Sequence, residues 1–161
     1  MKEKQKKKVM FISSTGGHLD ELLQLKEMFS HYDYHLVIEK DKTTKCLKKQ
    51  YGRKISYLVY GTRSDKLKYP FQFLWNCLRS LVIYLRYRPR YIVTTGTHTA
   101  VPMCYIGKLF RSKIIFIETF ANIHTQTLAG RMIYPIADLF LVQWEEMLSL
   151  YPKAKLGGSI Y

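Results

Sequence analysis

Short apolar runs recur along this chain and alternate with stretches in which apolar residues have helical spacing. Most runs are continuous, which is typical of strands that are buried on both faces of a parallel sheet. The alternation predicts βαβ units and therefore an open, doubly wound α/β sheet. We expect strands at Val9–Ser14, His35–Glu39, Ile55–Tyr60, Tyr91–Thr95, Lys113–Glu118 and Leu139–Gln143. We expect helices at Leu19–Phe29, Thr43–Tyr51, Phe71–Tyr87, Ala100–Phe110, Thr127–Ala137 and Glu145–Leu150.

The length of 161 residues and the hydrophobic content of 47% favour one domain with a real core. We assign this domain to residues 9–161, preceded by a basic tail at residues 1–8. Only one strand's length of apolar residues follows the tail, so we expect no signal peptide. The three cysteines, Cys46, Cys77 and Cys104, lack the spacing of metal ligands and are expected to be reduced thiols.

Ligands of such sheets bind outside the carboxyl ends of the strands, where helix N-termini point. The residues that follow the expected strands are small hydroxyl residues, glycines and a few charged or imidazole groups. This composition predicts an oxygen-rich, phosphorylated ligand at one edge of the sheet. The segments concerned are Ser13–His18, Gly61–Ser64, Thr94–Thr99 and Glu118–Asn122.

The first of these turns carries two glycines and a histidine. Gly16 and Gly17 permit positive φ and close backbone approach, and the next helix offers free N–H groups to an anion. With Ser14 and Thr15 they are our candidates for binding a ligand. His18 could act as a general base or as a donor to phosphate; the alternatives are a plain turn and an inert surface histidine. The turn matches neither the dinucleotide glycine fingerprint nor the P-loop.

The second and third turns complete the predicted site. Gly96, Thr97 and Thr99 resemble the first turn in composition, and Thr99 could instead simply cap a helix whose first turn contains Pro102. Glu118 ends an apolar strand, so its carboxylate is either buried and paired or lines the site, which we favour.

The stretch Tyr69–Arg90 is unusually apolar for a surface helix. Large apolar residues recur at helical spacing, while Gln72, Asn76, Arg79 and Arg86 form one polar stripe. Phe71–Tyr87 is shorter than the about 20 apolar residues of a spanning helix and contains arginines. It is either a core helix or a helix that rests on an anionic membrane, flanked by Arg90, Lys66 and Lys68. The residues expected to contact the membrane are Phe71, Phe73, Trp75, Arg79, Arg86 and Arg88.

The formal net charge of +14 implies an anionic partner. A basic nucleic-acid-binding α/β protein is the main alternative interpretation. Against it, the aromatic residues cluster in one apolar helix rather than on a stacking platform. We therefore expect no nucleic-acid partner. A self-sufficient nucleotide-binding enzyme is a weaker alternative, because the full glycine fingerprint is missing.

Three stretches carry a family resemblance: "STGGHLDEL", "TTGTHTAVP" and "IETFANIHTQTLAGRMIYPIADLFLVQWEEM". Together they resemble the short glycosyltransferase subunits of bacterial capsule and exopolysaccharide synthesis. These subunits are similar to the membrane-associated subunit of the eukaryotic two-chain transferase that adds the second GlcNAc to a dolichol-linked sugar. They are also similar to the N-terminal half of the transferase that makes peptidoglycan lipid II.

The resemblance implies a Rossmann-like domain, equivalent to the acceptor half of a GT-B glycosyltransferase, with the nucleotide-sugar half on a separate partner subunit. It implies that a hydroxyl of an undecaprenyl-diphosphate-linked saccharide attacks the anomeric carbon of a UDP-sugar. By position, His18 would be the base, and Gly16, Gly17, Gly96–Thr99, Glu118 and Asn122 would contact the acceptor. We expect no cofactor and no metal, and peripheral attachment to the cytoplasmic face of the cell membrane.

Overall fold

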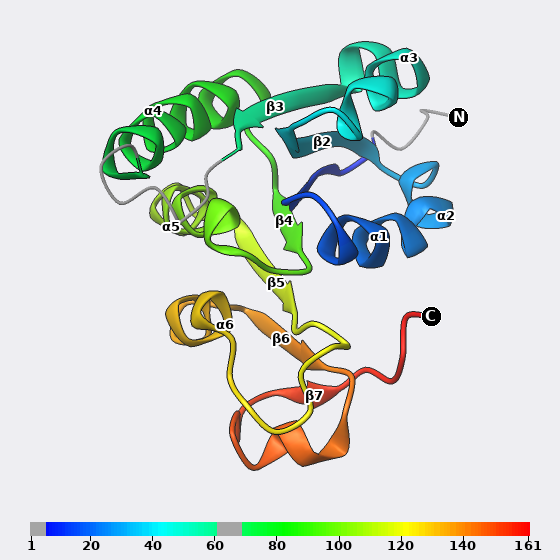
Figure 1. Ribbon diagram of the computed structural model, residues 1–161, viewed down its shortest axis with the longest axis vertical. Coiled ribbons are helices and arrows are strands. Elements are labelled where there is room, and N and C mark those ends of the chain that lie inside the picture. Colours follow the sequence, from blue (N-terminus) through cyan, green and yellow to red (C-terminus); the bar gives the residue numbers. More distant parts are fainter. Residues whose placement is uncertain (1–5, 61–68) are drawn as a thin grey trace.

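Seven parallel strands form one sheet in the computed structural model, which describes residues 6–60 and 69–161 (Figure 1). The strand order is β3-β2-β1-β4-β5-β6-β7, so the chain first runs outward from β1 and then crosses back to continue on the other side of it. The strands are β1 (Lys8–Ser13), β2 (Asp33–Lys40), β3 (Ile55–Val59), β4 (Tyr91–Thr94), β5 (Lys113–Ile117), β6 (Leu139–Val142) and β7 (Lys155–Leu156).

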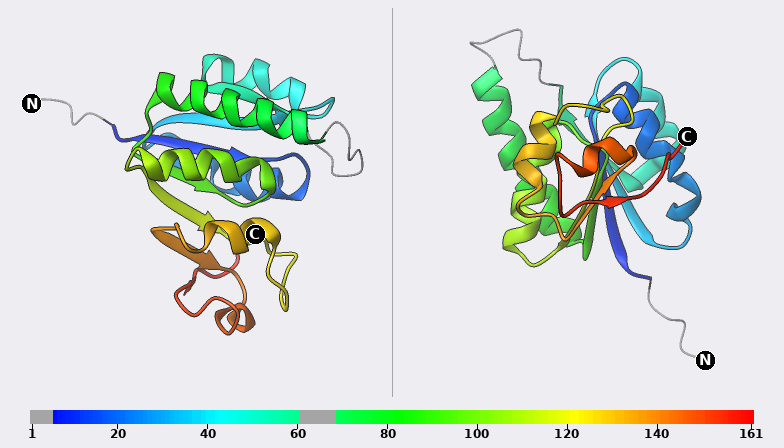
Figure 2. Two further views of the ribbon diagram at one scale, coloured as in Figure 1. Left: turned by 90° about the vertical axis from the view of Figure 1, so that its left-hand side faces the viewer. Right: turned by 90° about the horizontal axis from the view of Figure 1, so that it is seen from below.

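Helices cover both faces of this sheet (Figures 1 and 2). On one face lie α1 (Gly17–Gln24), α2 (Lys26–Phe29) and α3 (Leu47–Tyr51), and on the other lie α4 (Tyr69–Tyr87), α5 (Val101–Leu109) and α6 (Leu128–Ile133). Because side chains of a strand alternate between faces, β1 contributes to two cores. Met10 and Ile12 pack in the core on the α4–α5–α6 side, and Val9 and Phe11 pack in the core on the α1 side.

All six expected strands are present, and the doubly wound parallel sheet is confirmed. β7 was not expected, since two exposed residues give no apolar run. Some helices are wrong in detail: Leu25 interrupts the expected Leu19–Phe29, where an i→i+3 hydrogen bond from its N–H to the Leu22 carbonyl tightens the turn. The expected helix Glu145–Leu150 is only a 3₁₀ turn at Glu145–Leu148.

The other helices also differ from expectation at their ends. The expected helix Thr43–Tyr51 begins with a 3₁₀ turn at Thr44–Cys46, and another 3₁₀ turn, Gly52–Lys54, follows α3. α6 covers only the first half of the expected Thr127–Ala137. Such short elements carry too few turns for apolar periodicity to fix their limits.

Helix α4 presents its more polar side to the protein. The Asn76 side chain is buried and pairs with edge strand β3: the Val59 N–H donates to its Oδ1 and its Nδ2 donates to the Val59 carbonyl, both at 2.8 Å. The pairing satisfies a peptide group of an edge strand. The expected polar stripe therefore does not share one environment, because Arg79 and Arg86 are exposed.

The opposite side of α4 exposes large apolar side chains. Phe71 is 77% exposed, and Trp75 and Val82 are 55% and 63% exposed. Of the residues expected at a membrane, Phe71, Trp75, Arg79, Arg86 and Arg88 are exposed and Phe73 is half-buried. Within the described ranges, no helix is both long enough and apolar enough to cross a membrane. The turn Gly61–Ser64 and the flanking Lys66 and Lys68 lie outside the described residues.

Candidate functional site

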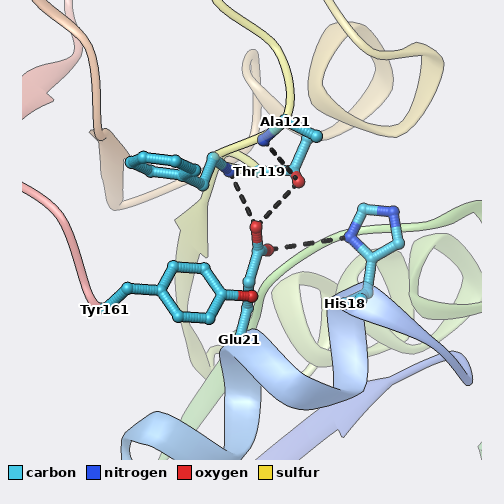
Figure 3. A pocket seen from close by; sticks show the side chains of 7 residues that line it. His18, Glu21, Thr119, Ala121 and Tyr161 are labelled. Carbon is cyan, nitrogen blue, oxygen red and sulfur yellow. Dashed lines mark hydrogen bonds and ion pairs between the residues drawn. The ribbon is translucent and has the colours of Figure 1, made fainter.

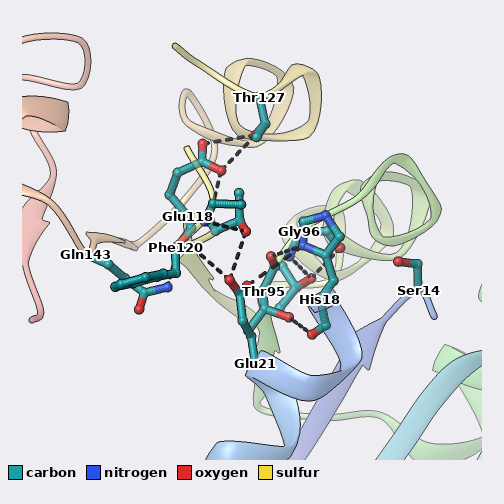
Figure 4. Close-up of polar contacts among 12 residues, drawn as sticks. Ser14, His18, Glu21, Thr95, Gly96, Glu118, Phe120, Thr127 and Gln143 are labelled. Carbon is teal, nitrogen blue, oxygen red and sulfur yellow. Dashed lines mark hydrogen bonds and ion pairs between the residues drawn. The ribbon is translucent and has the colours of Figure 1, made fainter. Parts of the chain in front are cut away.

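The first and second turns meet at the point where the strand order reverses. β1 pairs with β4 in the centre of the sheet, while the helices that follow them, α1 and α5, lie on opposite faces. Such a switch point leaves a crevice at the carboxyl edge, where ligands of doubly wound sheets bind. Figure 4 shows the polar side chains that gather there.

Gly16 caps helix α1 and Gly17 begins it, shortly after β1 ends at Ser13. Gly16 has φ +71°, a conformation that favours glycine, and serves as N-cap without a side-chain hydrogen bond to the helix. No atom lies within 4 Å of the position that a Cβ on Gly17 would occupy. The N-terminus of α1 is therefore uncapped by side chains and open to an approaching anion.

His18 fastens the first turn to the second. Its Nδ1 lies 2.9 Å from the Thr95 carbonyl oxygen, and the Thr95 hydroxyl donates to the His18 carbonyl at 2.6 Å. A carbonyl oxygen can only accept, so Nδ1 carries the proton in neutral imidazole and Nε2 keeps its lone pair. A Cβ on Gly96 would lie 3.2 Å from the His18 ring, so the close approach requires glycine there.

The second turn has a strained backbone. Thr97 is β-branched and has φ +73°, a rare combination that costs about 1–3 kcal/mol and is often found at functional sites. Its hydroxyl oxygen is buried without a hydrogen bond to the described residues. Thr99 is buried, and its hydroxyl donates to Glu39 Oε1. The alternative in which Thr99 only caps a helix is therefore wrong: Ala100 is the N-cap of α5, with a proline in the first turn.

Glu118 lies at the end of β5 and is only 1% exposed. Its carboxylate accepts from the Thr119 N–H at 3.0 Å and the Tyr151 hydroxyl at 2.9 Å, and the Thr127 hydroxyl lies 2.9 Å from both oxygens. A Cβ on Gly130 would lie 2.3 Å from Glu118 Oε2, so α6 can pack there only with glycine. The structure thus places Glu118 in a buried cluster with Thr127, Gly130 and Tyr151, hereafter the Glu118 cluster.

Glu21 is a buried carboxylate that the sequence interpretation missed. It is 3% exposed, and its Oε1 accepts from the Thr119 hydroxyl at 2.8 Å and the Phe120 N–H at 2.7 Å (Figure 3). Its Oε2 lies 3.9 Å from His18 Nδ1. The sequence did contain one signal for it: Glu21 is three residues after His18, and residues i and i+3 share one face of a helix.

Two hollows flank His18, and its side chain lines both. One has a volume of about 460 Å³ and is also lined by Gly17, Glu21, Thr119, Phe120, Ala121 and Tyr161. The other has a volume of about 240 Å³ and is also lined by Thr97, His98, Thr127, Leu128 and Ala129.

The remaining predicted site residues lie apart from these hollows. Ser14 is buried and donates to the Thr15 carbonyl, away from the hydrogen-bonded group around His18 (Figure 4). The Asn122 amide donates to the Thr125 carbonyl at 3.2 Å within the third turn. The described residues contain no group of three or more His, Cys, Asp or Glu side chains that could hold a metal ion.

The sheet order, with glycine turns at its switch point, is that of a Rossmann-like α/β domain of the kind that forms one half of GT-B-type proteins. MurG of Acinetobacter baumannii superposes with a TM-score of 0.70 and 15% identity, over 87% of this chain and 42% of MurG. A UDP-N-acetylglucosamine 2-epimerase from Rickettsia bellii gives a TM-score of 0.71 and 17% identity, over 97% of this chain and 46% of the epimerase.

The chain belongs to the family described as "Oligosaccharide biosynthesis protein Alg14 like", whose profile matches residues 9–160. UDP-N-acetylglucosamine transferase subunit ALG14 of Yarrowia lipolytica is 26% identical over 94% of this chain and 80% of the relative. The human subunit of that name is 24% identical over 94% of this chain and 82% of its own length. The Candida albicans subunit is 34% identical over 53% of this chain, and the match spans 42% of that relative.

Proposed function

We propose that this chain is the acceptor-binding, membrane-associating subunit of a two-chain glycosyltransferase. Relatives named as subunits of a UDP-N-acetylglucosamine transferase support a role in sugar transfer from UDP-GlcNAc and a separate partner chain. The observation that carries the proposal is the placement of His18 between two hollows, with Nδ1 bound to Thr95. Its Nε2 makes no hydrogen bond with the described residues and can accept a proton.

In the proposed reaction, a hydroxyl of a lipid-diphosphate-linked saccharide attacks the anomeric carbon of the UDP-sugar. The new oxygen–carbon bond forms as the bond from that carbon to the UDP phosphate oxygen breaks, and UDP leaves. The hydroxyl proton moves to His18 Nε2, so His18 acts as the general base. The open N-terminus of α1 at Gly17 favours the acceptor diphosphate, because its free N–H groups carry partial positive charge.

The other acceptor contacts are proposed from the positions of the residues in the turns. Gly96 and Thr97 lie against His18 or line its smaller hollow. Ser14, Thr15, Thr99, Glu118 and Asn122 would act through the shape of the turns rather than by lining either hollow. The undecaprenyl carrier, the capsule or exopolysaccharide product and the cytoplasmic face of the membrane stay predictions that rest on the motif resemblance.

The decisive experiment compares this chain alone, the nucleotide-sugar-binding subunit alone and the two together. Radioactive UDP-GlcNAc and an undecaprenyl-diphosphate-linked saccharide are the substrates, and the labelled lipid product is extracted and counted. We expect turnover only from the pair. Full turnover by this chain alone would contradict a two-chain enzyme, and no turnover by the pair on any lipid-linked saccharide would contradict the proposed reaction.

Membrane association is proposed through the outward side of α4. A helix that buries its Asn76 and exposes Phe71, Trp75 and Val82 gains free energy when these side chains enter an interface. Arg79 and Arg86 on the exposed surface suit anionic lipid, at about 1 kcal/mol for each basic residue near the surface.

Vesicle sedimentation tests this surface. Trp75→Glu combined with Arg86→Glu should release the purified chain from vesicles of 30% phosphatidylserine, with a loss of affinity of about 10-fold or more. Met28→Glu with Arg53→Glu is the matched control, because both residues are exposed outside α4 and the charge change is equal. Equal loss in both variants would indicate net charge alone, and unchanged binding of the α4 variant would exclude this surface.

A further inference from the structure

Glu21 is held rigidly at the edge of the larger hollow beside His18. The Thr119 hydroxyl and the Phe120 N–H both donate to Oε1, so the third turn fixes the side chain of a residue on α1 (Figure 3). The residue is 3% exposed. A carboxylate with this geometry cannot swing out to solvent without breaking both hydrogen bonds.

The second oxygen of the same carboxylate has no such partner. Oε2 is buried and makes no hydrogen bond with the described residues. A buried, unpaired carboxylate oxygen costs free energy in a resting protein. His18 Nδ1, which can share a positive charge, lies 3.9 Å from it.

We propose that Glu21 is a positioning residue that acts through His18. When Nε2 takes the proton of the attacking hydroxyl, the imidazole becomes positively charged while Nδ1–H stays bound to the Thr95 carbonyl. That carbonyl orients the ring but is neutral, whereas the Glu21 carboxylate lies close enough to stabilise the new charge. This role rests on the proposed function, since it requires His18 to be the base.

The division of labour resembles that of a nucleophile, base and orienting carboxylate, with one difference. Here a backbone carbonyl already selects the tautomer, so the carboxylate contributes only charge. An opposite charge about 4 Å away, in a surrounding of intermediate polarity, predicts a loss of about 10- to 100-fold in kcat when it is removed. KM should be nearly unchanged, because the imidazolium forms only as the reaction proceeds.

Glu21→Gln is a clean probe of this charge. Glutamine has the same shape and keeps an oxygen that can accept from Thr119 and Phe120. The amide nitrogen replaces Oε2, which accepts no hydrogen bond from the described residues. Asp20→Asn is the matched control, since it removes the same charge from an exposed neighbour on the same helix, and it should leave kcat unchanged.

The test is a double-mutant cycle in the assembled two-chain transferase with UDP-GlcNAc and a lipid-linked saccharide. Glu21→Gln should lower kcat by about 10- to 100-fold, and it should cause no further loss in a His18→Ala background. An equal further loss in that background would overturn the inference, as would an unchanged kcat or an effect confined to KM. If His18→Ala alone leaves kcat unchanged, the base assignment falls, and the role of Glu21 falls with it.

Discussion

Glu21 and Glu118 are both buried carboxylates at the carboxyl edge of the sheet, yet they are bonded differently. Both oxygens of Glu118 accept hydrogen bonds, from Thr119, Thr127 and Tyr151. Only one oxygen of Glu21 accepts, and the other faces the histidine across 3.9 Å. Their exposed fractions, 3% and 1%, do not distinguish them.

The hydrogen-bond count, rather than burial, distinguishes the two glutamates. A fully satisfied buried carboxylate rigidifies the elements that bond to it, here the third turn and α6. A half-satisfied one keeps an unused charge beside a group that can change its own charge. The first turn should therefore respond to substitution mainly in activity, and the Glu118 cluster mainly in stability.

The largest expected effect is on activity at His18. His18→Ala should lower kcat of the assembled pair by about 10²- to 10⁴-fold, because it removes the proposed base. The melting temperature should change little, because the side chain makes one hydrogen bond and is partly exposed. Product formation and thermal unfolding are measured on the same samples.

His31→Ala is the control for this substitution, since it removes an exposed imidazole elsewhere. Its rate should equal that of the parent protein. A loss below about threefold at His18 would leave the base to the partner chain, since a missing base costs far more. A large fall in melting temperature would instead give His18 a structural role.

The sequence predicted the architecture well because continuous apolar runs report strands that are buried on both faces. It also predicted that the first and second turns meet, since both follow central strands, and Gly96 does lie against His18. The sequence could not predict the hydrogen-bond partners of the two glutamates. Tyr151 is 33 residues from Glu118, and Thr119 is 98 residues from Glu21, so only the folded chain brings them together.

Helix α4 illustrates the same limit. Its apolar pattern correctly indicated an unusual surface, but Asn76 faces inward because edge strand β3 offers it a peptide group. Spacing along a helix cannot show that an amide side chain will meet such a partner, since Val59 lies 17 residues earlier.

The next largest expected effect is on stability. It compares a glycine-to-alanine substitution in the Glu118 cluster with one in the first turn. Gly130→Ala should lower the free energy of unfolding by about 2–4 kcal/mol, because its Cβ would meet Glu118 Oε2 at 2.3 Å and Tyr151 Oη at 2.4 Å. Gly17→Ala should leave stability unchanged or slightly higher, because nothing lies within 4 Å and alanine favours helix. Urea unfolding of the isolated chain measures both.

Activity of the assembled pair sharpens this contrast. Gly17→Ala should slow sugar transfer, because a methyl group would stand at the proposed site of the acceptor diphosphate. Gly130→Ala should retain most of its rate per folded molecule at low temperature. The reverse pattern, with activity lost at Gly130 and stability lost at Gly17, would contradict the proposed difference between the first turn and the Glu118 cluster.

The smallest expected effect directly tests the hydrogen bonding of the Glu118 carboxylate. Tyr151→Phe removes one donor from Oε2, which keeps only Thr127, and should lower the free energy of unfolding by about 1 kcal/mol at neutral pH. Tyr105→Phe is the control, because the Tyr105 hydroxyl is exposed and bonds only to a backbone carbonyl. Its effect should be close to zero.

The sign of the pH dependence makes the test specific to Tyr151. Burial, and then the Glu118 carboxylate, raise the pKa of Tyr151 above the ordinary value of 10.0. The folded protein then holds this proton more tightly than the unfolded chain, so the stabilisation is complete below pH 10 and is lost as the pH rises above it. The difference in unfolding free energy between the parent protein and Tyr151→Phe should therefore shrink above pH 10 and then reverse.

Urea titrations at pH 7, 9, 10 and 11 measure this difference, in which contributions common to both proteins cancel. A difference that stays constant to pH 11 would show that Tyr151 does not donate to Glu118, and the contrast between a saturated and a half-bonded glutamate would lose its clearest support.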